Sequence, residues 1–169
     1  CAMLARMYVP PARAGDGCTG LSGQVVLHRY RLDSELGSGS LGVVYRATEL
    51  ATGNAVAAKV MRPELREAPG VEARFLREAR LTRRLEHPYI PRGLAAGLAP
   101  SKAPMLVMEF VDGENLRARV ERVGPLPVSE VFAVALATSE ALAYAHEQRV
   151  VHRDVKPGNL MFARAEAAP

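Results

Sequence analysis

The chain has 169 residues and a mass of 18.2 kDa, about the size of one domain with a single hydrophobic core. Hydrophobic residues make up 49% and charged residues 24%, which excludes collagen-like, coiled-coil and wholly disordered classes. The net charge of +4 suits a phosphate-bearing ligand as readily as nucleic acid and selects neither. Because uninterrupted apolar runs are short, we expect no segment to span a bilayer and no membrane contact from this chain.

The first 24 residues are expected to form a disordered leader, because proline and glycine recur through them. Both cysteines, Cys1 and Cys18, lie in this leader. Two cysteines alone build neither a disulfide framework nor a zinc site, so we expect a reducing, cytoplasmic compartment. The leader also lacks the apolar stretch of a signal peptide. Since residue 1 is Cys rather than Met, we expect a fragment or a translation that begins upstream of the folded domain.

The next segment has the pattern of antiparallel strands. Alternating apolar and polar residues predict a strand from Tyr30 to Leu36, and β-branched and aromatic residues predict a second over 43–47. After a turn at 52–54, the apolar run 55–61 predicts a third strand, antiparallel to the second.

Helices dominate the rest of the chain. Helical spacing of apolar residues predicts a helix over 71–85, which ends before His87-Pro88. A buried strand over 103–111 and a short helix over 116–123 follow, and Ser129 is expected to cap a long helix that runs to about Gln148. Strands followed by a helix, a strand and further helices predict an α+β fold.

A glycine-rich turn, Gly37-Ser38-Gly39-Ser40-Leu41-Gly42, joins the first two predicted strands. In a dinucleotide-binding fold the third glycine opens a helix, but here strand-forming residues follow it at once. A hairpin whose backbone amides approach triphosphate oxygens fits better, with Val44 covering the base. An ordinary glycine hairpin remains the alternative.

Lys59 lies inside an apolar strand, where its ammonium group needs an anion. ATP phosphates are one candidate, and Glu78 in the following helix is another. Five arginines surround Glu78, which indicates either a solvated helix face or a nucleic-acid surface. We favour the solvated face and expect no nucleic-acid partner, because no aromatic residues are interleaved for base stacking.

The segment 152–159 reads His-Arg-Asp-Val-Lys-Pro-Gly-Asn and is the most specific motif in the chain. The spacing from Asp154 to Lys156 to Asn159 is that of a phosphotransfer loop. In such a loop the aspartate orients a hydroxyl for in-line attack on a γ-phosphate, the lysine steadies the transferring group, and the asparagine holds a metal ion.

With these motifs in order, the chain resembles the eukaryotic-like protein kinases, and among them the bacterial serine/threonine branch. The resemblance runs from about Tyr30 to Phe162 and includes Val56-Ala57-Ala58-Lys59 and the hinge-like segment 107–113. Ala58 and Val155 depart mildly from the usual residues. Lys156-Pro157 is typical of the serine/threonine class.

The resemblance implies ATP and Mg²⁺ as cofactors and a protein with a serine or threonine hydroxyl as substrate. Gly37, Ser38, Gly39 and Gly42 would cover the phosphates, and Lys59, paired with Glu78, would contact two of them. Asp154 would be the catalytic base, Lys156 the γ-phosphate contact and Asn159 a magnesium ligand. The implied adenine pocket comprises Leu36, Val44, Ala57 and Met161, backbone groups of Glu109 and Val111, and Met108 as gatekeeper.

The resemblance also implies a domain division. A small lobe of antiparallel sheet and one helix would span 25–108, and the hinge and the start of a mainly helical large lobe would span 109–169. No Asp-Phe-Gly, activation segment or Ala-Pro-Glu follows Phe162. We therefore expect a serine/threonine protein kinase fragment that is inactive alone, and exposed apolar surface on the helix 129–148. The alternatives are a catalytically dead nucleotide-binding or scaffolding pseudokinase module and, third, a small-molecule phosphotransferase.

Overall fold

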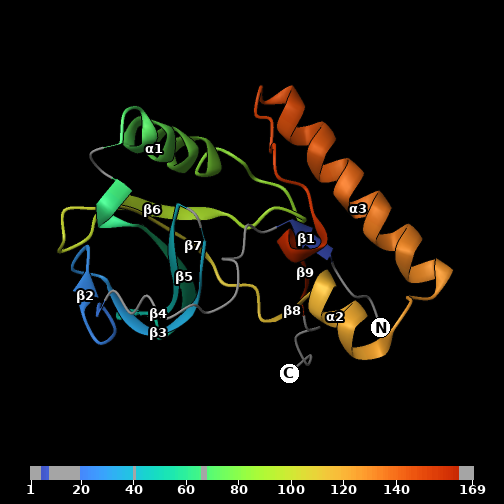
Figure 1. Ribbon diagram of the computed structural model, residues 1–169, viewed down its shortest axis with the longest axis horizontal. Helices are drawn as coiled ribbons and strands as arrows, with labels where there is room; N and C mark the ends of the chain where they lie inside the picture. The colour runs from blue at the N-terminus through green and yellow to red at the C-terminus, as the bar shows by residue number, and fades with distance from the viewer. Residues whose placement is uncertain (1–4, 8–19, 40, 66–67, 164–169) are drawn as a thin grey trace. The chain divides into compact units, whose positions relative to one another are not determined.

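The computed structural model describes residues 5–7, 20–39, 41–65 and 68–163, and for 5–7, 74 and 78 it describes the backbone alone (Figure 1). Contacts between these residues divide the chain into two compact units. The sheet unit comprises Pro10–Arg84 and Arg92–Phe110. The helical unit comprises Cys1–Val9, Leu85–Pro91 and Val111–Pro169. The short segment Leu85–Pro91 therefore belongs to the helical unit although its neighbours in sequence belong to the sheet.

The sheet unit is built on six antiparallel strands in the order β2-β3-β4-β5-β7-β6. Their bounds are β2 Val25–Val26, β3 Tyr30–Ser38, β4 Gly42–Glu49, β5 Ala55–Met61, β6 Gly93–Leu98 and β7 Pro104–Glu109. Alternate residues of the central strands, such as Val43, Tyr45 and Val107, enter one hydrophobic core together with Tyr30 and Leu32. The pattern follows from the period of two in a strand, which sends every second side chain to the same face.

A single long helix, α1 (Val71–Thr82), packs against β6 and β7 (Figure 1). It buries Phe75 and Ala79, which lie one turn apart on the same face. Its N-terminal boundary is Gly70, whose φ of 76° lies in the left-handed region that favours glycine. A short 3₁₀ helix, η1 (Pro63–Leu65), lies between β5 and α1.

The helical unit contains α2 (Leu116–Val123), α3 (Val128–Glu147) and a 3₁₀ turn, η2 (Pro157–Asn159). A small antiparallel sheet orders its strands β1-β9-β8, namely Ala5–Met7, Leu160–Ala163 and Gly113–Asn115. The Asn115 side chain accepts a hydrogen bond of 2.9 Å from the Ala118 amide and so caps α2. Gly113 allows β8 to approach β9, because a Cβ there would lie 1.8 Å from the Phe162 carbonyl oxygen.

The segment Leu85–Pro91 is tied to α3 by Tyr144. The Glu86 amide donates to the Tyr144 hydroxyl over 3.0 Å, and the rings of His87 and Tyr144 stack with centroids 5.1 Å apart. His87 Nδ1 also accepts from the Tyr89 amide at 3.2 Å. His87 therefore has a structural role, stacking on a helix and ordering its own turn.

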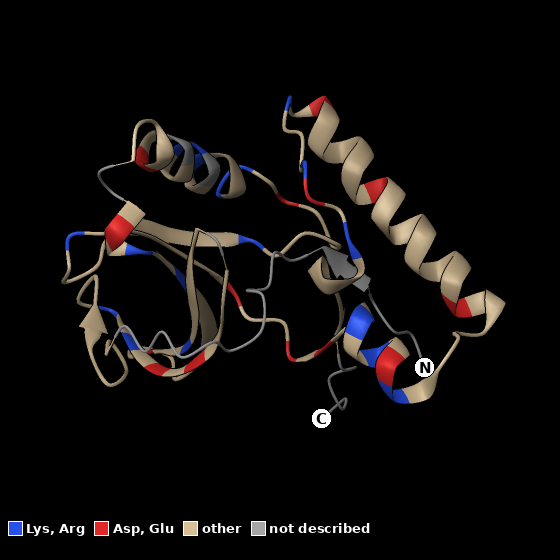
Figure 2. Ribbon diagram, in the orientation of Figure 1, with Lys and Arg blue, Asp and Glu red and all other residues tan. Residues whose placement is uncertain are grey.

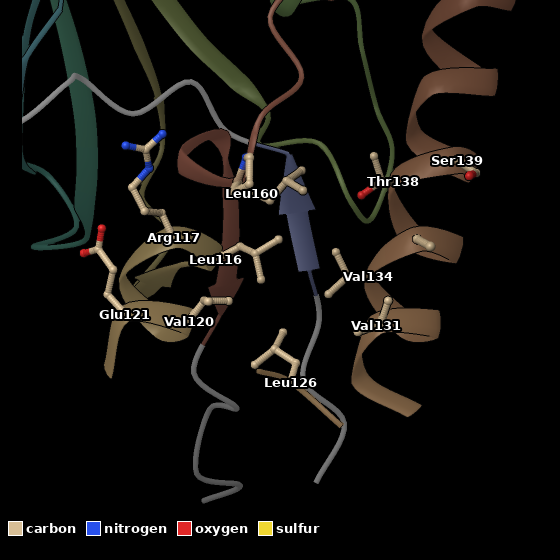
Figure 3. Close-up of a pocket in the computed structure, with 12 residues that line it drawn as sticks. Leu116, Arg117, Val120, Glu121, Leu126, Val131, Val134, Thr138, Ser139 and Leu160 are labelled. Carbon is tan, nitrogen blue, oxygen red and sulfur yellow. The ribbon is translucent and has the colours of Figure 1, made fainter. Parts of the chain in front are cut away.

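One stripe of α3 is buried, through Val134, Ala137, Ala141 and Ala145, while Phe132 on another face is 72% exposed. The predicted exposed apolar surface on this helix is thus confirmed. An apolar groove of about 640 Å³ lies in the helical unit, and Figure 3 shows the residues that line it. The leucine and valine side chains that line it come from α2, α3, β9 and the loop before α3: Leu116, Val120, Leu126, Val131, Val134 and Leu160.

The strands over 30–36, 43–47, 55–61 and 103–111 and the three helices occur where the sequence predicts them, with shifted ends. The strand β6 is missed, because Gly-Leu-Ala-Ala-Gly-Leu carries no β-branched residue. The prediction that Ser129 caps the long helix is wrong, since α3 begins at Val128 after Pro127, whose fixed φ suits a helix entry.

Most of the predicted leader, including Cys1 and Cys18, lies outside the described residues. Ala5–Met7 instead form a strand, because their backbone pairs with β9. Among the helices of the described chain, α3 is the one long and apolar enough to cross a bilayer by length and composition, so short apolar runs do not settle the question and the expectation of no spanning segment stays a prediction. Core helices of soluble proteins can be as long and as apolar, so the property does not assign α3 to a membrane.

Candidate active site

One face of the sheet collects four of the predicted nucleotide-binding residues. Val44 on β4 pairs with Lys59 on β5, and Ala57 on β5 pairs with Met108 on β7. Residues that pair directly across strands project to the same side, and so do residues two apart on a strand. Their neighbours in sequence fill the hydrophobic core on the opposite face. Val44, Ala57, Lys59 and Met108 therefore share the face that the core does not use.

Lys59 is only 7% exposed on this face. Its ammonium nitrogen lies 5.7 Å from the centroid of the Phe75 ring of α1, within the range of a cation–π contact. The ring is thus one neighbour of the ammonium group, and the stem of the side chain runs through buried surface. The predicted pair with Glu78 falls on a side chain outside the described residues, so this pair stays a prediction.

The glycine-rich turn between β3 and β4 is closed by hydrogen bonds. The Gly39 amide donates to the Gly42 carbonyl at 2.8 Å, so it closes the turn instead of pointing at a phosphate. Arg62, just after β5, reaches the turn twice. Its Nε donates to the Gly39 carbonyl at 3.1 Å and its backbone amide donates to the Leu41 carbonyl at 3.2 Å. Ser40 lies outside the described residues.

The third glycine of the motif is required by packing. A Cβ on Gly42 would lie 2.4 Å from the Val60 carbonyl oxygen, so no other residue fits without moving β4 or β5. Sequence reasoning missed Arg62. The signal was present, because the hairpin register that aligns Gly42 with Met61 also brings residue 62 to the turn.

The remaining residues of the implied adenine pocket lie on several elements. Leu36 is 42% exposed where β3 is irregular, and Val111 is buried at the start of the helical unit. Met161 is half-buried on β9. Glu109 ends β7, and its amide donates to the Arg92 carbonyl at 2.9 Å.

Asp154, in the loop before η2, is held by two neighbours that the motif contains. Lys156 Nζ lies 2.8 Å from Oδ2 of Asp154, and Asn159 Nδ2 donates to the same oxygen at 3.0 Å. The hydrogen bond from Lys156, helped by the one from Asn159, holds the pKa of the Asp154 carboxyl below its ordinary value. The carboxylate is therefore ionised at neutral pH, and with its side chain 52% exposed it is open to a substrate.

Asn159 organises this loop from within the fold. It is 1% exposed, and its amide nitrogen also donates to the Asp154 backbone carbonyl at 2.7 Å. Arg153 has a φ of 64°, in the left-handed region that an arginine rarely adopts. Backbone strain of this kind persists where surrounding contacts impose it, and it is common at functional sites. The structure brings Asp154, Lys156 and Asn159 together as the spacing predicts.

The loop around Asp154 carries oxygen atoms of the kind that bind a magnesium ion. Mg²⁺ prefers oxygen ligands in an octahedron and keeps several waters. Asp154 and Asn159 carry carboxylate and amide oxygens side by side, so oxygen chemistry of the right kind is present. Within the described residues, no three acidic, histidine or cysteine side chains form a cluster that could hold a metal ion. The residues thus fit a magnesium ion for which Asn159 provides one oxygen ligand, while water and phosphate oxygens provide the others.

Comparison with known proteins assigns the chain to a family. Residues 30–168 match the protein kinase domain family, and the chain belongs to that family. Its fold is accordingly the small lobe of a kinase domain and the start of the large lobe. Protein kinases as a family use ATP and Mg²⁺.

Among curated proteins, the chain is 37% identical over 142 residues to the serine/threonine-protein kinase PknB of Mycobacterium leprae, covering 82% of this chain and 23% of that protein. It is 38% identical over 137 residues to the serine/threonine-protein kinase pkn2 of Myxococcus xanthus, covering 81% of this chain and 16% of that protein. The crystal structure of the PknI kinase domain of Mycobacterium tuberculosis superposes with a TM-score of 0.71 and 31% identity, covering 85% of this chain and 58% of that one. The chain thus spans less than a quarter of these curated relatives and little more than half of the solved kinase domain.

Proposed function

We propose that this chain supplies the nucleotide-binding face and the catalytic loop of a protein serine/threonine kinase, which transfers the γ-phosphoryl group of ATP to a protein hydroxyl. The observation that carries the proposal is the Asp154 carboxylate, kept ionised and oriented by Lys156 and Asn159. The relatives named serine/threonine-protein kinases support it. We place the reaction in the cytoplasm.

Asp154 would orient the substrate hydroxyl and take its proton as that oxygen forms a bond to the γ-phosphorus and the bond to the ADP oxygen breaks. Lys156 lies within hydrogen-bond distance of this carboxylate and would shift toward the γ-phosphoryl oxygens when these are bound. Asn159 would hold the loop through its amide nitrogen and contribute its amide oxygen to a magnesium ion. When bound, that ion would neutralise charge on the phosphate oxygens.

The sheet unit would bind the nucleotide. Lys59, beside Phe75, would provide the positive charge for the α- and β-phosphates, with Glu78 as its proposed partner. Val44, Ala57 and Met108 would offer an apolar face to adenine, joined in the proposed pocket by Leu36 and Met161. The Glu109 amide already donates to the Arg92 carbonyl. The hydrogen bond proposed between Glu109 and adenine would therefore use the Glu109 carbonyl group, and the one proposed at Val111 would use its amide. Gly37, Ser38, Gly39 and Gly42 would cover the phosphates.

Two measurements test the proposal. The chain alone should bind a non-hydrolysable ATP analogue in calorimetry, and Lys59→Met should weaken that binding. A protein that carries this sequence within a complete kinase domain should transfer labelled phosphate to a serine or threonine substrate. Asp154→Asn should lower that rate by about two to four orders of magnitude.

The outcomes separate the candidate functions. Transfer that Asp154→Asn leaves intact would contradict the proposed mechanism. Nucleotide binding that needs no magnesium, with no transfer from the complete domain, would instead support a catalytically dead nucleotide-binding or scaffolding module. Phosphorylation of a small molecule but of no protein would support the small-molecule phosphotransferase.

A further inference from the structure

The outward face of α1 is strongly basic. Arg77 and Arg80 are three residues apart, which places them together on the side opposite Phe75 and Ala79, and Arg84 follows just past the end of the helix. Arg83 is the C-terminal capping residue of the helix. All four side chains are exposed. Figure 2 shows the basic residues along α1 and just past its end.

The four arginines surround a hollow and not a flat surface. Arg77, Arg80, Arg83 and Arg84 line a depression of about 430 Å³, and Leu81 is the one apolar residue that lines it with them. We name this feature the basic hollow. Four guanidinium groups so close together repel one another, and like charges three and four residues apart destabilise a helix. An anion that entered the hollow would relieve this repulsion.

Among the described side chains, no carboxylate pairs with any of these four arginines. The contrast with α2 is clear, because Arg119 there binds Glu114 and Glu130, and Arg122 also binds Glu114. On the sheet, Arg29 pairs with Glu49 in the same way. Several arginines elsewhere in the chain thus have carboxylate partners, whereas those of the basic hollow have none among the described side chains.

The hollow is fixed to the sheet. Gly93 on β6 packs so closely on the end of α1 that a Cβ there would lie 2.9 Å from both the Cα and the amide nitrogen of Arg83. The Arg83 amide donates to the Ala79 carbonyl and the Arg84 amide to the Leu81 carbonyl. The backbone under the arginines is therefore held in place, so binding a ligand would order side-chain ends only.

We propose that the basic hollow binds a phosphorylated segment of a protein partner. A phosphoryl group carries close to two negative charges and three acceptor oxygens, so it can bind several guanidinium forks at once, which a single carboxylate cannot. Leu81 gives the neighbouring peptide side chain an apolar contact. Nucleic acid is disfavoured, because no aromatic side chain lines the hollow for base stacking and α1 is only about 18 Å long.

The test is a fluorescence anisotropy titration of the full chain with a labelled acidic peptide that contains phosphothreonine. The unphosphorylated peptide, a single-stranded oligonucleotide and phosphatidylserine vesicles are titrated in parallel, at low and at physiological salt. The phosphopeptide should bind about tenfold more tightly than its unphosphorylated form, the order expected for added charge-assisted hydrogen bonds. Inorganic phosphate should compete only weakly, since it lacks the peptide contact with Leu81.

Three variants locate the site. Arg80→Glu with Arg84→Glu should abolish the preference for the phosphopeptide, and Arg80→Lys with Arg84→Lys should reduce it, because lysine keeps the charge but not the planar fork. Arg149→Glu, an exposed arginine of the helical unit, is the matched control and should bind as the unmodified chain does. Circular dichroism checks that each variant is folded.

Several outcomes would overturn the proposal. The first is equal affinity for the phosphorylated and unphosphorylated peptides. The second is unchanged phosphopeptide affinity in the Arg80→Glu, Arg84→Glu variant. The third is that the oligonucleotide or the vesicles bind more tightly than the phosphopeptide, and that this binding is lost in the same variant. Peptide binding requires no phosphoryl transfer. The anisotropy titration therefore tests the basic hollow, and the phosphate-transfer assay separately tests the proposed kinase activity.

Discussion

Arg62 gives a sharp test of how the glycine-rich turn is held. Its guanidinium Nε donates to the Gly39 carbonyl at 3.1 Å, and its backbone amide separately donates to Leu41. The change Arg62→Ala removes the first bond and leaves the second. It should therefore loosen the turn without unfolding the hairpin that carries it.

The size of the effect follows from that single bond. Hydrogen bonds from charged donors contribute about 1.5–3 kcal/mol, and the half-buried position of Arg62 places this one at the lower end. Since about 1.4 kcal/mol corresponds to a factor of ten, exchange of the Gly39 amide proton should accelerate about tenfold. Affinity for an ATP analogue should fall by up to the same factor if the turn covers the phosphates.

Amide hydrogen exchange of Gly39 and calorimetry with the analogue measure the two effects. Arg31→Ala is a matched control, because the Arg31 Nε also donates a hydrogen bond, to Asp33 on the same strand, and does not reach the turn. Unchanged exchange at Gly39 in Arg62→Ala would refute the role of Arg62. Faster exchange with undiminished nucleotide affinity would refute the link between the turn and the nucleotide.

Three further changes have expected outcomes. Gly42→Ala places a Cβ 2.4 Å from the Val60 carbonyl oxygen and should lower the free energy of unfolding by about 1–3 kcal/mol, measured as a lower melting temperature. The control Gly158→Ala places a Cβ with no atom within 4 Å and should leave the melting temperature unchanged. Asn115→Ala removes the cap of α2 and should destabilise it by about 0.5–2 kcal/mol, seen as faster exchange of the α2 amides, and Asn115→Ser should restore protection. Lys156→Met should raise the pKa of Asp154 toward its ordinary value in a carboxyl titration followed by NMR. Folding lowers the pKa of Asp154, so the stability linked to this carboxyl is present above the pKa of the unfolded chain. It is lost as the pH falls through the pKa of the folded chain. Lys156→Met should therefore lose less stability on acidification than the unmodified chain does.

The elements that the sequence predicted are those with a strong local signal. The strands β3, β4, β5 and β7 carry alternation or β-branched residues, and all three helices carry helical periodicity. The strand β6 carries neither, because its alanines and glycines are held by pairing with β7, which no local pattern encodes. The cap at Asn115 did have a signal, an asparagine just before a helical run, and was missed.

The candidate site divides in the same way. Asp154, Lys156 and Asn159 lie within six residues, so their spacing alone predicts their contact. The pairing of Val44 with Lys59 follows from the predicted hairpin. The contact of Arg62 with Gly39 also follows from the hairpin register, which brings residue 62 beside the turn. The approach of Gly93 to Arg83, by contrast, depends on how a helix packs on a sheet. Such contacts are set by tertiary packing, which a single sequence does not display.

The hydrogen bond between the Glu86 amide and the Tyr144 hydroxyl joins residues 58 positions apart in the chain. The helical unit therefore closes only when Leu85–Pro91 meets a helix that is synthesised later, and part of the intervening chain, Arg92–Phe110, belongs to the sheet unit. We expect the sheet unit to fold first and to reduce the entropy lost on this closure by shortening the free loop. A polypeptide that begins at residue 109 would lack Leu85–Pro91, and with it the contacts that Glu86 and His87 make with Tyr144 of α3.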